Sequence, residues 1–333
     1  MERNPSRRIS MSSVVQGYIL PGLPHPLLCP EKNPGYQRLR DGFDQVRQEI
    51  SESNADLILI YSTMWPSVIG HQILSRPKPK WTHVDELFHD LGSIPYQFRI
   101  DSEFAQAYSQ NATQRGLMTR TIDYHGFPID TGSVVALKLI NPDNKIPAVI
   151  LSSNVYADRA ETVVFGKAAK ETLKAQNKTA IAIGITTLSN RLHQHFIDES
   201  NDRIHSLKDQ EWNLKILEFL EAGRLEDVAQ LSRQIHKEAR VHKVNNFKTM
   251  WWLASLMGAH NRYSGCVHAY EAVYGTGCAV IGLSPAEHAA RDLEFDEDSP
   301  DFYAGDRNVL APSLEFVSSF SSQSSDPGNK GGF

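Results

Sequence analysis

Apolar side chains follow two different periods along the first part of the chain. Residues 14–19 and 56–61 are short, largely apolar runs rich in branched side chains, which is typical of buried strands. Between them, apolar residues recur at spacings of four, three and four and predict a helix over residues 36–52. The residues at these spacings are Leu39, Phe43, Val46 and Ile50. A strand, a helix and a second strand in this order favour a mostly parallel sheet covered by helices.

The same two patterns continue through the rest of the chain. Further strands are predicted at residues 94–100, 134–140, 147–152, 179–185 and 278–283. Further helices are predicted at residues 160–176, 210–222, 225–240 and 248–257. Asn177 is expected to end the first of these helices in the left-handed conformation, and Gly223 to break the second from the third. Together these elements predict an α/β fold in a single domain, with a central mostly parallel or mixed sheet flanked by helices.

The two ends of the chain differ in composition from this domain. Residues 1–13 are expected to form a flexible N-terminal extension, and Met11 is an alternative start to Met1. The domain itself is expected to cover residues 14–283. Residues 284–333 form a C-terminal extension, acidic at first and then rich in serine and glycine, which we expect to be largely disordered from about residue 317.

Composition and charge exclude several classes of protein. A hydrophobic content of 41% with 22% charged residues is ordinary for a globular chain with a sizeable core. The net charge of −5 and the lack of a basic stripe give no reason to expect nucleic acid. No apolar stretch is long enough to span a membrane, and the arginine-containing start lacks the apolar core of a secretory signal. Three irregularly spaced cysteines indicate reduced thiols, so we expect a cytoplasmic protein.

Thirteen histidines raise the possibility of a metal site. Two imidazoles and one carboxylate on one face are the ligands of mononuclear non-haem Fe(II) oxygenases. Histidines and a glutamate close to the ends of predicted strands are His25, His71, His193 or His195, and Glu271. Their spacing is loose, and the alternative interpretation is exposed or packed polar residues. No His-Glu-x-x-His, Cys-x-x-Cys pair or Ca²⁺ loop is present in the sequence.

The segment Ser62-Thr63-Met64-Trp65 follows the predicted strand at residues 56–61. Open α/β sheets collect their ligands in the loops that follow the carboxyl ends of such strands. The thioether of Met64 packs well against other side chains but is a poor ligand for a hard divalent ion. This position, where an enzyme would place a metal ligand, therefore offers none.

Several segments together resemble the class III extradiol ring-cleaving dioxygenases of the protocatechuate 4,5-dioxygenase type. They are Leu20–Pro24, Asp56–Trp65, His83–Glu86, Tyr124–Gly132, Gln176–Lys178, Lys237–Val241 and Tyr274–Ile281. Within that family the resemblance is to the 2-aminophenol 1,6-dioxygenase type, and to its non-catalytic α chains rather than its catalytic β chains. It covers about residues 14–283. It implies an α/β domain, an α2β2 assembly, and Fe(II)- and O₂-dependent cleavage of a 2-aminophenol- or catechol-type ring.

The resemblance also implies where the catalytic residues would stand. Catalytic relatives have a Pro-His pair after the first strand, where this chain has Pro21 and Gly22. Their second iron histidine lies in a Ser-Pro-His-Trp motif, where this chain has Met64. Their carboxylate ligand aligns with Cys266, and their acid–base histidine with Asn190. All three ligands and the proton-transfer group are then missing, because neither glycine nor a thioether, a lone thiol or an amide replaces them.

The resemblance therefore implies a non-catalytic, stabilising subunit of a two-subunit extradiol dioxygenase. Fe(II) and most contacts to the aromatic substrate would belong to a homologous catalytic β-type partner, and this chain would hold no cofactor. Trp251, Trp252 and Met257 are candidates for the interface with that partner, or equally for the core. Two alternatives stay open: an active enzyme with a relocated iron site, and a module that binds an aromatic ligand without chemistry. The provisional ligands of the relocated site are His25, His71 and Glu271.

Overall fold

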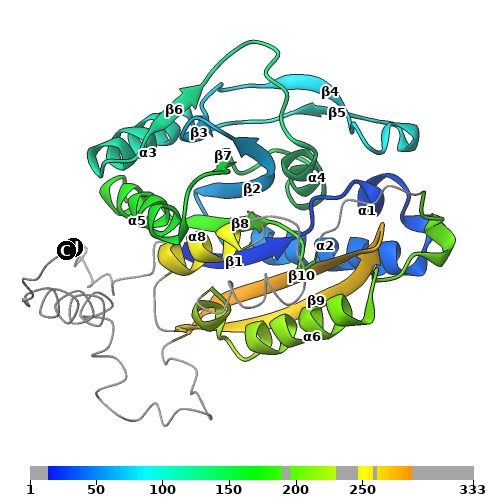
Figure 1. Ribbon diagram of the computed structural model, residues 1–333. Coiled ribbons are helices and arrows are strands. Elements are labelled where there is room, and N and C mark those ends of the chain that lie inside the picture. Colours follow the sequence, from blue (N-terminus) through cyan, green and yellow to red (C-terminus); the bar gives the residue numbers. More distant parts are fainter. Residues whose placement is uncertain (1–13, 190–195, 230–246, 258–260, 287–333) are drawn as a thin grey trace, which may run out of the picture. The chain divides into compact units, whose positions relative to one another are not determined.

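A mixed eight-stranded sheet forms the centre of the computed structural model, which describes residues 14–189, 196–229, 247–257 and 261–286 (Figure 1). Within these residues, the strand order is β6-β3-β7-β2-β8-β1-β10-β9. The strands are β1 (Val14–Leu20), β2 (Leu57–Ser67), β3 (His71–Leu74), β6 (Thr119–Ile122), β7 (Ala148–Asn154), β8 (Ala180–Ile185), β9 (Tyr263–Val273) and β10 (Thr276–Pro285).

The middle of the sheet is parallel. β8 pairs in parallel with β1 on one side and with β2 on the other, and β2 pairs in parallel with β7. β10 runs antiparallel to β1 and forms a hairpin with β9. All six residues of β8 are buried, as expected for a parallel strand covered on both faces. The carboxyl ends of β1, β2 and β8 therefore lie together at one edge of the sheet, where the hairpin turn before β10 also lies.

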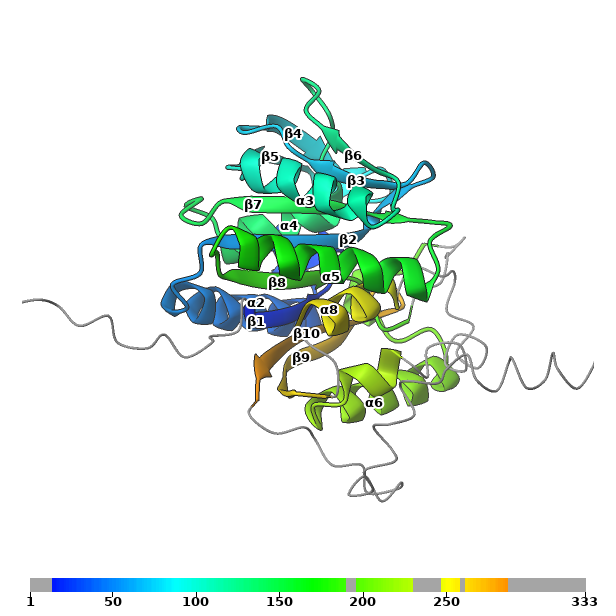
Figure 2. The same cartoon turned by 90° about the vertical axis from the view of Figure 1, so that its left-hand side faces the viewer.

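Helices cover both faces of this sheet (Figure 2). Helices α3 (Ser102–Gln114), α5 (Arg159–Ala175), α6 (Leu207–Glu221) and α8 (Lys248–Met257) share one hydrophobic core with the first face. Helices α2 (Pro34–Glu52) and α4 (Thr131–Ile140) share a second core with the opposite face. The residues at the start of α2 favour a helix. The Asn33 side chain accepts a hydrogen bond from the Gly35 N–H, and Pro34 lacks only a backbone N–H that would have no partner within the helix. A short helix, α1 (His25–Leu28), follows β1.

A separate two-stranded sheet lies against α4 (Figure 1). Its strands are β4 (Lys80–Val84) and β5 (Ser93–Gln97), which pair antiparallel. We call residues 76–100 the β4–β5 arm. Ile94, Tyr96 and Phe98 of the arm are buried in the core that contains α4. A hairpin of this size is marginal alone, so this packing stabilises the arm.

The mixed α/β architecture confirms the predicted fold class, and most predicted elements are present. The helices expected at residues 36–52, 160–176, 210–222 and 248–257 correspond to α2, α5, α6 and α8. The strands expected at residues 14–19, 56–61, 147–152 and 179–185 correspond to β1, β2, β7 and β8. Asn177 has a φ of 51° and Gly223 a φ of 72°, which confirms both predicted helix ends. Of the helix predicted over residues 225–240, residues 225–229 are helical, and the remainder lies outside the described residues.

The predicted strand at residues 134–140 is wrong, because this segment belongs to helix α4. Its apolar run is buried almost throughout, so neither a two-residue nor a 3.6-residue period stands out. The local signal for a helix is Asp130, whose carboxylate accepts a hydrogen bond from the Ser133 N–H at the helix start. The strand predicted at residues 94–100 is shorter, since β5 ends at Gln97 and Ile100 forms an isolated bridge with Ala148.

Strand β9 was not predicted. It is the first strand of a hairpin whose two-residue turn, Tyr274-Gly275, has φ values of 51° and 72°. Two positive φ values are the geometry of a tight hairpin turn whose twist matches that of the strands, and glycine adopts it readily. The strand predicted at residues 278–283 is the centre of β10, which runs from Thr276 to Pro285. Helix α3 and strands β3, β4 and β6 were also not predicted.

The tryptophan pair of α8 lies at the core of the first face. Trp252 is fully buried, and its indole N–H donates to the Tyr108 hydroxyl at 3.3 Å. Trp251 and Met257 are partly buried against the same core. The core interpretation therefore holds for Trp252. Among the described helices, none is both long enough and apolar enough to cross a bilayer. The expected extension at residues 1–13 and all but the first three residues of 284–333 lie outside the described part of the chain.

Candidate functional site

A small crevice of about 70 Å³ opens at the edge of the sheet where the carboxyl ends of β1, β2 and β8 meet the start of β10. This is the position at which open α/β sheets bind their ligands. The residues that line it are Gly22, Leu23, Thr63, Met64, Thr186, Thr187 and Thr276. The crevice thus contains the two positions at which the resemblance places iron histidines, Gly22 and Met64.

Gly22 and Met64 are in direct contact inside this crevice. A Cβ atom built on Gly22 would overlap the Met64 sulfur and would lie 2.9 Å from both the Gly132 Cα and the Ile185 Cγ2 atoms. A Cβ atom built on Gly132 would lie 2.9 Å from the Met64 sulfur and 2.6 Å from Ile185 Cγ2. Residues from three different elements, β2, α4 and β8, therefore fill the space in front of residue 22. No side chain larger than hydrogen fits there without a shift of backbone.

A polar contact brings the start of α4 into this position. β2 continues to Ser67, so the segment Ser62–Trp65, which was expected to follow the strand, lies inside it. The hydroxyl of Ser62, the last residue of β2 that pairs with β8, donates to Asp130 Oδ1 at 2.7 Å, and the Met64 N–H donates to Ser62 Oγ at 3.2 Å. Asp130 Oδ1 also caps α4 through the Ser133 N–H at 3.0 Å. One carboxylate oxygen thus joins β2 to the first turn of α4, where Gly132 lies.

The β4–β5 arm is attached next to this contact. His83 Nε2 lies 2.6 Å from the Thr131 hydroxyl oxygen, and that hydroxyl donates to Asp85 Oδ2 at 2.5 Å. Because the threonine proton goes to the carboxylate, His83 must donate to the threonine oxygen. The other oxygen of Asp85 accepts the N–H groups of Leu87 and Phe88. These bonds fix the arm to the first turn of α4.

The lining of the crevice does not fit an Fe(II) ion. Among the described residues, its functional groups are threonine hydroxyls and one thioether, with no imidazole and no carboxylate. Non-haem Fe(II) sites use two histidines and one carboxylate, and a thioether is a soft ligand suited to other metals. In the part of the chain that the structure describes, no group of three or more His, Cys, Asp or Glu side chains is arranged to hold a metal ion.

His25 follows β1 in α1 and lies among aromatic rings. Its side chain is 1% exposed, and its ring centroid lies 4.6 Å from that of Phe88 and 5.1 Å from that of Tyr36. Burial lowers the pKa of His25 to about 4, against the opposing effect of nearby carboxylates, chiefly Asp202. It is therefore a neutral core histidine, and it does not line the crevice.

His71 lies at the first position of β3, on the face covered by α5. It is fully buried, stacks on Phe165 at 4.2 Å, and its Nε2 lies 3.1 Å from a Glu161 carboxylate oxygen. Burial lowers the pKa of His71 to about 4, and the ammonium of Lys248 acts in the same direction. His71 is thus also neutral at physiological pH.

Glu271 and Cys266 both lie in β9. Glu271 forms an ion pair with Arg38 of α2, and Cys266 is exposed and faces Gly282 of β10. Neither lines the crevice. The structure therefore gives His25, His71 and Glu271 three different surroundings, and it does not bring Cys266 to Gly22 and Met64. Asn190, His193 and His195 lie outside the described residues.

Sequence reasoning assigned no role at the crevice to Gly132, Ile185 or Thr276, although Gly132 and Thr276 belong to segments that carry the family resemblance. Thr276 lines the crevice, and Gly132 and Ile185 fill the space beside Gly22. Gly132 lies two residues before the segment that was predicted as a strand at residues 134–140, and Ile185 is the last residue of the strand predicted at residues 179–185. Their role depends on the neighbouring positions of β1, β2 and β8 and on the start of α4. The local signal that could have predicted a helix start here is the sequence Asp130-Thr131-Gly132, in which the aspartate caps the helix.

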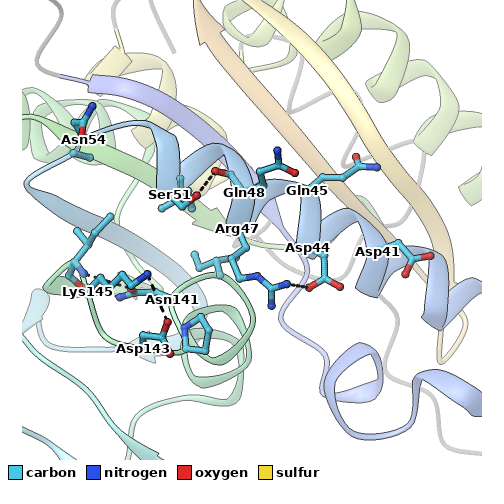
Figure 3. Close-up of a pocket in the computed structure, with 15 residues that line it drawn as sticks. Asp41, Asp44, Gln45, Arg47, Gln48, Ser51, Asn54, Asn141, Asp143 and Lys145 are labelled. Atoms are coloured by element: carbon cyan, nitrogen blue, oxygen red, sulfur yellow. Dashed lines mark hydrogen bonds and ion pairs between the residues drawn. The ribbon is translucent and has the colours of Figure 1, made fainter.

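A wider groove of about 920 Å³ lies between α2 and the loop that follows α4 (Figure 3). It is lined by residues that precede β2 and β7, so it lies at the amino-terminal ends of these strands. Four of its five charged side chains pair with one another: Arg47 with Asp44 at 3.0 Å, and Lys145 with Asp143 at 3.8 Å. These internal ion pairs make the groove a poor candidate for an aromatic substrate.

Comparison with known proteins places this architecture in a family. The family described as the catalytic LigB subunit of aromatic ring-opening dioxygenase matches residues 21–282. The chain is 31% identical to the 2-aminophenol 1,6-dioxygenase alpha subunit of Pseudomonas sp. over 273 residues, which is 82% of this chain and 99% of that one. It is 28% identical to the beta subunit of the Pseudomonas sp. enzyme over 289 residues, which is 80% of this chain and 93% of that subunit.

A solved structure shares the fold at low sequence identity. The uncharacterized protein JW3007 of Escherichia coli K12 has a TM-score of 0.58 and 10% identity, and the match covers 81% of this chain and all of that one. Together with the family match, these similarities show that the chain belongs to the LigB family, and it is a relative of the class III extradiol dioxygenases. Within that family it is similar both to an α and to a β subunit of one two-subunit enzyme, which confirms the resemblance inferred from the sequence.

Proposed function

We propose that this chain is the non-catalytic subunit of a two-subunit Fe(II)-dependent extradiol dioxygenase that opens a 2-aminophenol- or catechol-type ring with O₂. The observation that carries the proposal is the contact between Gly22 and Met64. These two residues stand where the resemblance places iron histidines. Met64, Gly132 and Ile185 together fill the space that a side chain at residue 22 would occupy. A lining of hydroxyls and one thioether offers Fe(II) no suitable set of ligands.

The iron and the catalytic step would then belong to a homologous partner chain. Similarity to both subunits of the Pseudomonas sp. enzyme supports a partner of the same fold, and an α2β2 assembly is the simplest arrangement of two such pairs. In that assembly this chain would stabilise its partner. Its three cysteines are free thiols, which supports a reducing, cytoplasmic location.

The size of the crevice argues against a module that binds an aromatic ligand. An engineered protein cavity that binds benzene has a volume of about 150 Å³. The crevice measures about 70 Å³, roughly half of that volume, and an aminophenol is larger than benzene. The relocated iron site has equally little support, because Glu161 occupies one nitrogen of His71 and Arg38 occupies the carboxylate of Glu271.

The test is the iron content of the purified chain after anaerobic reconstitution with Fe(II) and removal of free metal. The beta subunit of the Pseudomonas sp. enzyme, treated in parallel, serves as the control for a chain of the same family. We expect almost no iron on this chain alone. One tightly bound iron per chain would overturn the proposal, and His25, His71 and Glu271 would become the residues to mutate first.

A second measurement separates a stabilising subunit from a chain without a partner. Ring cleavage of 2-aminophenol is followed for the beta subunit of the Pseudomonas sp. enzyme, expressed alone and together with this protein, and for this protein alone. We expect no turnover by this chain alone and a longer-lived catalytic activity in the mixture. Turnover by this chain alone would contradict a non-catalytic role.

A further inference from the structure

The outer face of the β4–β5 arm carries an ordered sequence of charges. Side chains alternate along a strand, so every second residue of β4 points outward. Lys80, Thr82 and Val84 form this outer row within β4, and Lys78 and Glu86, in the bends that flank the strand, are exposed as well. Between them, Asp85 and Pro79 are buried. The row is therefore basic at the base of the arm, neutral in the middle and acidic at its tip.

The neighbouring strand repeats the same order. β5 runs antiparallel to β4 with Thr82 opposite Pro95 and Lys80 opposite Gln97. Its exposed positions are Ser93, Pro95, Gln97 and, just beyond the strand, Arg99. Arg99 thus adds a positive charge at the base, while the exposed Asp90 adds a negative charge near the tip. The two strands give one face with a positive end and a negative end.

Apolar side chains are exposed between and beside these charges. Val84, in the outer row, is 48% exposed, and Leu87 at the tip is 76% exposed. Trp81 is 50% exposed but belongs to the opposite face of β4, where it pairs with the buried Tyr96. Trp81, Pro95 and Tyr96 also line an open hollow of about 760 Å³. Exposed aromatic and apolar side chains around a hollow are typical of the centre of a protein interface. Within the described residues, Lys78, Lys80, Glu86 and Asp90 form no ion pairs.

We propose that two copies of this chain associate through this face of the β4–β5 arm, related by a two-fold axis. A two-fold interface uses the same patch on both chains, so the patch must be complementary to itself. A face that is positive at one end, apolar in the middle and negative at the other meets this condition when two copies lie antiparallel. A partner of different sequence needs no such order of charges, which is why the second copy is the occupant that fits.

The register follows from the position of the neutral residues. With the axis close to Thr82 and Pro95, Lys78 of one copy faces Glu86 of the other, because each lies four residues from Thr82. Lys80 of one copy then covers Val84 of the other with its aliphatic stem. The interface goes beyond the proposed function, since it requires neither iron nor a catalytic partner.

The test is a charge-exchange experiment with the full chain, measured by sedimentation velocity over a wide range of concentrations. Two variants reverse the two ends of the face: K78E/K80E and E86K/D90K. Each is expected to weaken the dimer by about tenfold or more, because attractive pairs become repulsive at both symmetric ends. K167E/K170E, which makes the same charge change on the exposed side of α5, serves as the matched control and should leave the dimer unchanged.

Mixing the two weakened variants gives the decisive result. In a mixed dimer, the reversed base of one chain meets the reversed tip of the other, and the remaining two ends keep their original charges. The mixture should therefore recover a dimer that neither variant forms alone, which general destabilisation of the fold cannot produce. Failure of the mixture to recover the dimer would overturn the proposed register.

Two further outcomes would overturn the proposal while leaving the proposed function intact. One is a wild-type chain that stays monomeric up to its solubility limit. The other is a dimer that K167E/K170E weakens as much as K78E/K80E does, since the contact would then lie elsewhere. If the monomeric wild type binds the Pseudomonas sp. beta subunit and the arm variants do not, the face belongs to a heterologous partner rather than to a second copy.

Discussion

The sulfur of Met64 lies in the space that a side chain at residue 22 would need. Gly22 follows β1, Met64 lies within β2, and β8 lies between these two strands in the sheet. They are in contact because Gly22 has no Cβ atom. Ile185, the last residue of β8, lies beside Gly22 and closes the same space. The contact makes the effects of substitutions at the two positions depend on each other.

Gly22→Ala should destabilise the protein by about 1–3 kcal/mol, the usual cost of adding a methyl group to a packed site. Part of this cost should disappear in the Met64→Ala background, because the sulfur is then absent and the contacts with Gly132 and Ile185 remain. Urea unfolding of the wild type, both single variants and the double variant measures the coupling free energy. Equal costs of Gly22→Ala in both backgrounds would show that the residues do not compete for space.

Restoring histidines at both family positions should not restore an iron site. In the variant Gly22→His/Met64→His, the Gly132 Cα and Ile185 Cγ2 atoms still obstruct residue 22, and the crevice still lacks a carboxylate. We expect less than one iron per chain after anaerobic reconstitution, together with a lower free energy of unfolding. Met64→His alone serves as the control for the effect of one histidine on stability. Stoichiometric iron in the double variant would show that the crevice can open.

The stability of the protein should fall as the pH is lowered from about 6.5 towards 4. Burial lowers the pKa of His71 from 6.5 to about 4, so in this window the unfolded chain binds a proton that the folded chain does not. The stabilisation is complete above pH 6.5 and is lost as the pH falls to the folded pKa, with a total of about 3 kcal/mol. His71→Gln should make the plot of unfolding free energy against pH shallower in this window.

His89→Gln, at an exposed position, serves as the control for replacing an imidazole by an amide. His25 should contribute a loss of the same sign and size as His71, because burial also lowers its pKa to about 4. A slope that is identical in the wild type and in His71→Gln would contradict a neutral, buried His71.

Asp202 should be important for the hairpin turn that borders the crevice. Its carboxylate accepts the N–H groups of Tyr274 and Gly275 and the hydroxyl of Tyr36, the last two at 2.8 and 2.7 Å. Asp202→Ala removes all three bonds and should cost about 2–4 kcal/mol, whereas Tyr36→Phe removes one and should cost about 1 kcal/mol. Chemical denaturation measures both. Similar costs for the two variants would mean that the turn does not depend on the carboxylate.

Patterns that depend on neighbours in sequence predicted most of the fold. The recurrence of Leu39, Phe43, Val46 and Ile50 predicted α2 because one face of that helix is buried and the other exposed. The segment 134–140 could not be assigned in this way, because α4 is buried almost all round and its apolar run has no polar side. β9 was missed because most of its residues are half-buried, which leaves a weak alternation of apolar and polar positions.

The candidate site was predictable only in part. The local motifs pointed to Gly22 and Met64 as positions without ligands, through resemblance to a family. Their contact could not be predicted, since it depends on the order of β1, β8 and β2 in the sheet and on the turn at Gly132. The provisional ligands His25, His71 and Glu271 failed to gather for the same reason: proximity to strand ends in the sequence does not decide which face or edge a side chain reaches.

The close approach of Gly22 and Gly132 also limits which side chains residue 22 can accept. A histidine at residue 22 would overlap the backbone of Gly132, and a single change of side chain does not move that backbone. A larger residue at position 22 therefore requires a shift of the start of α4, which the hydrogen bonds of Ser62 and Asp130 hold in place. Residue 22 is therefore confined to glycine as long as the start of α4 keeps this position.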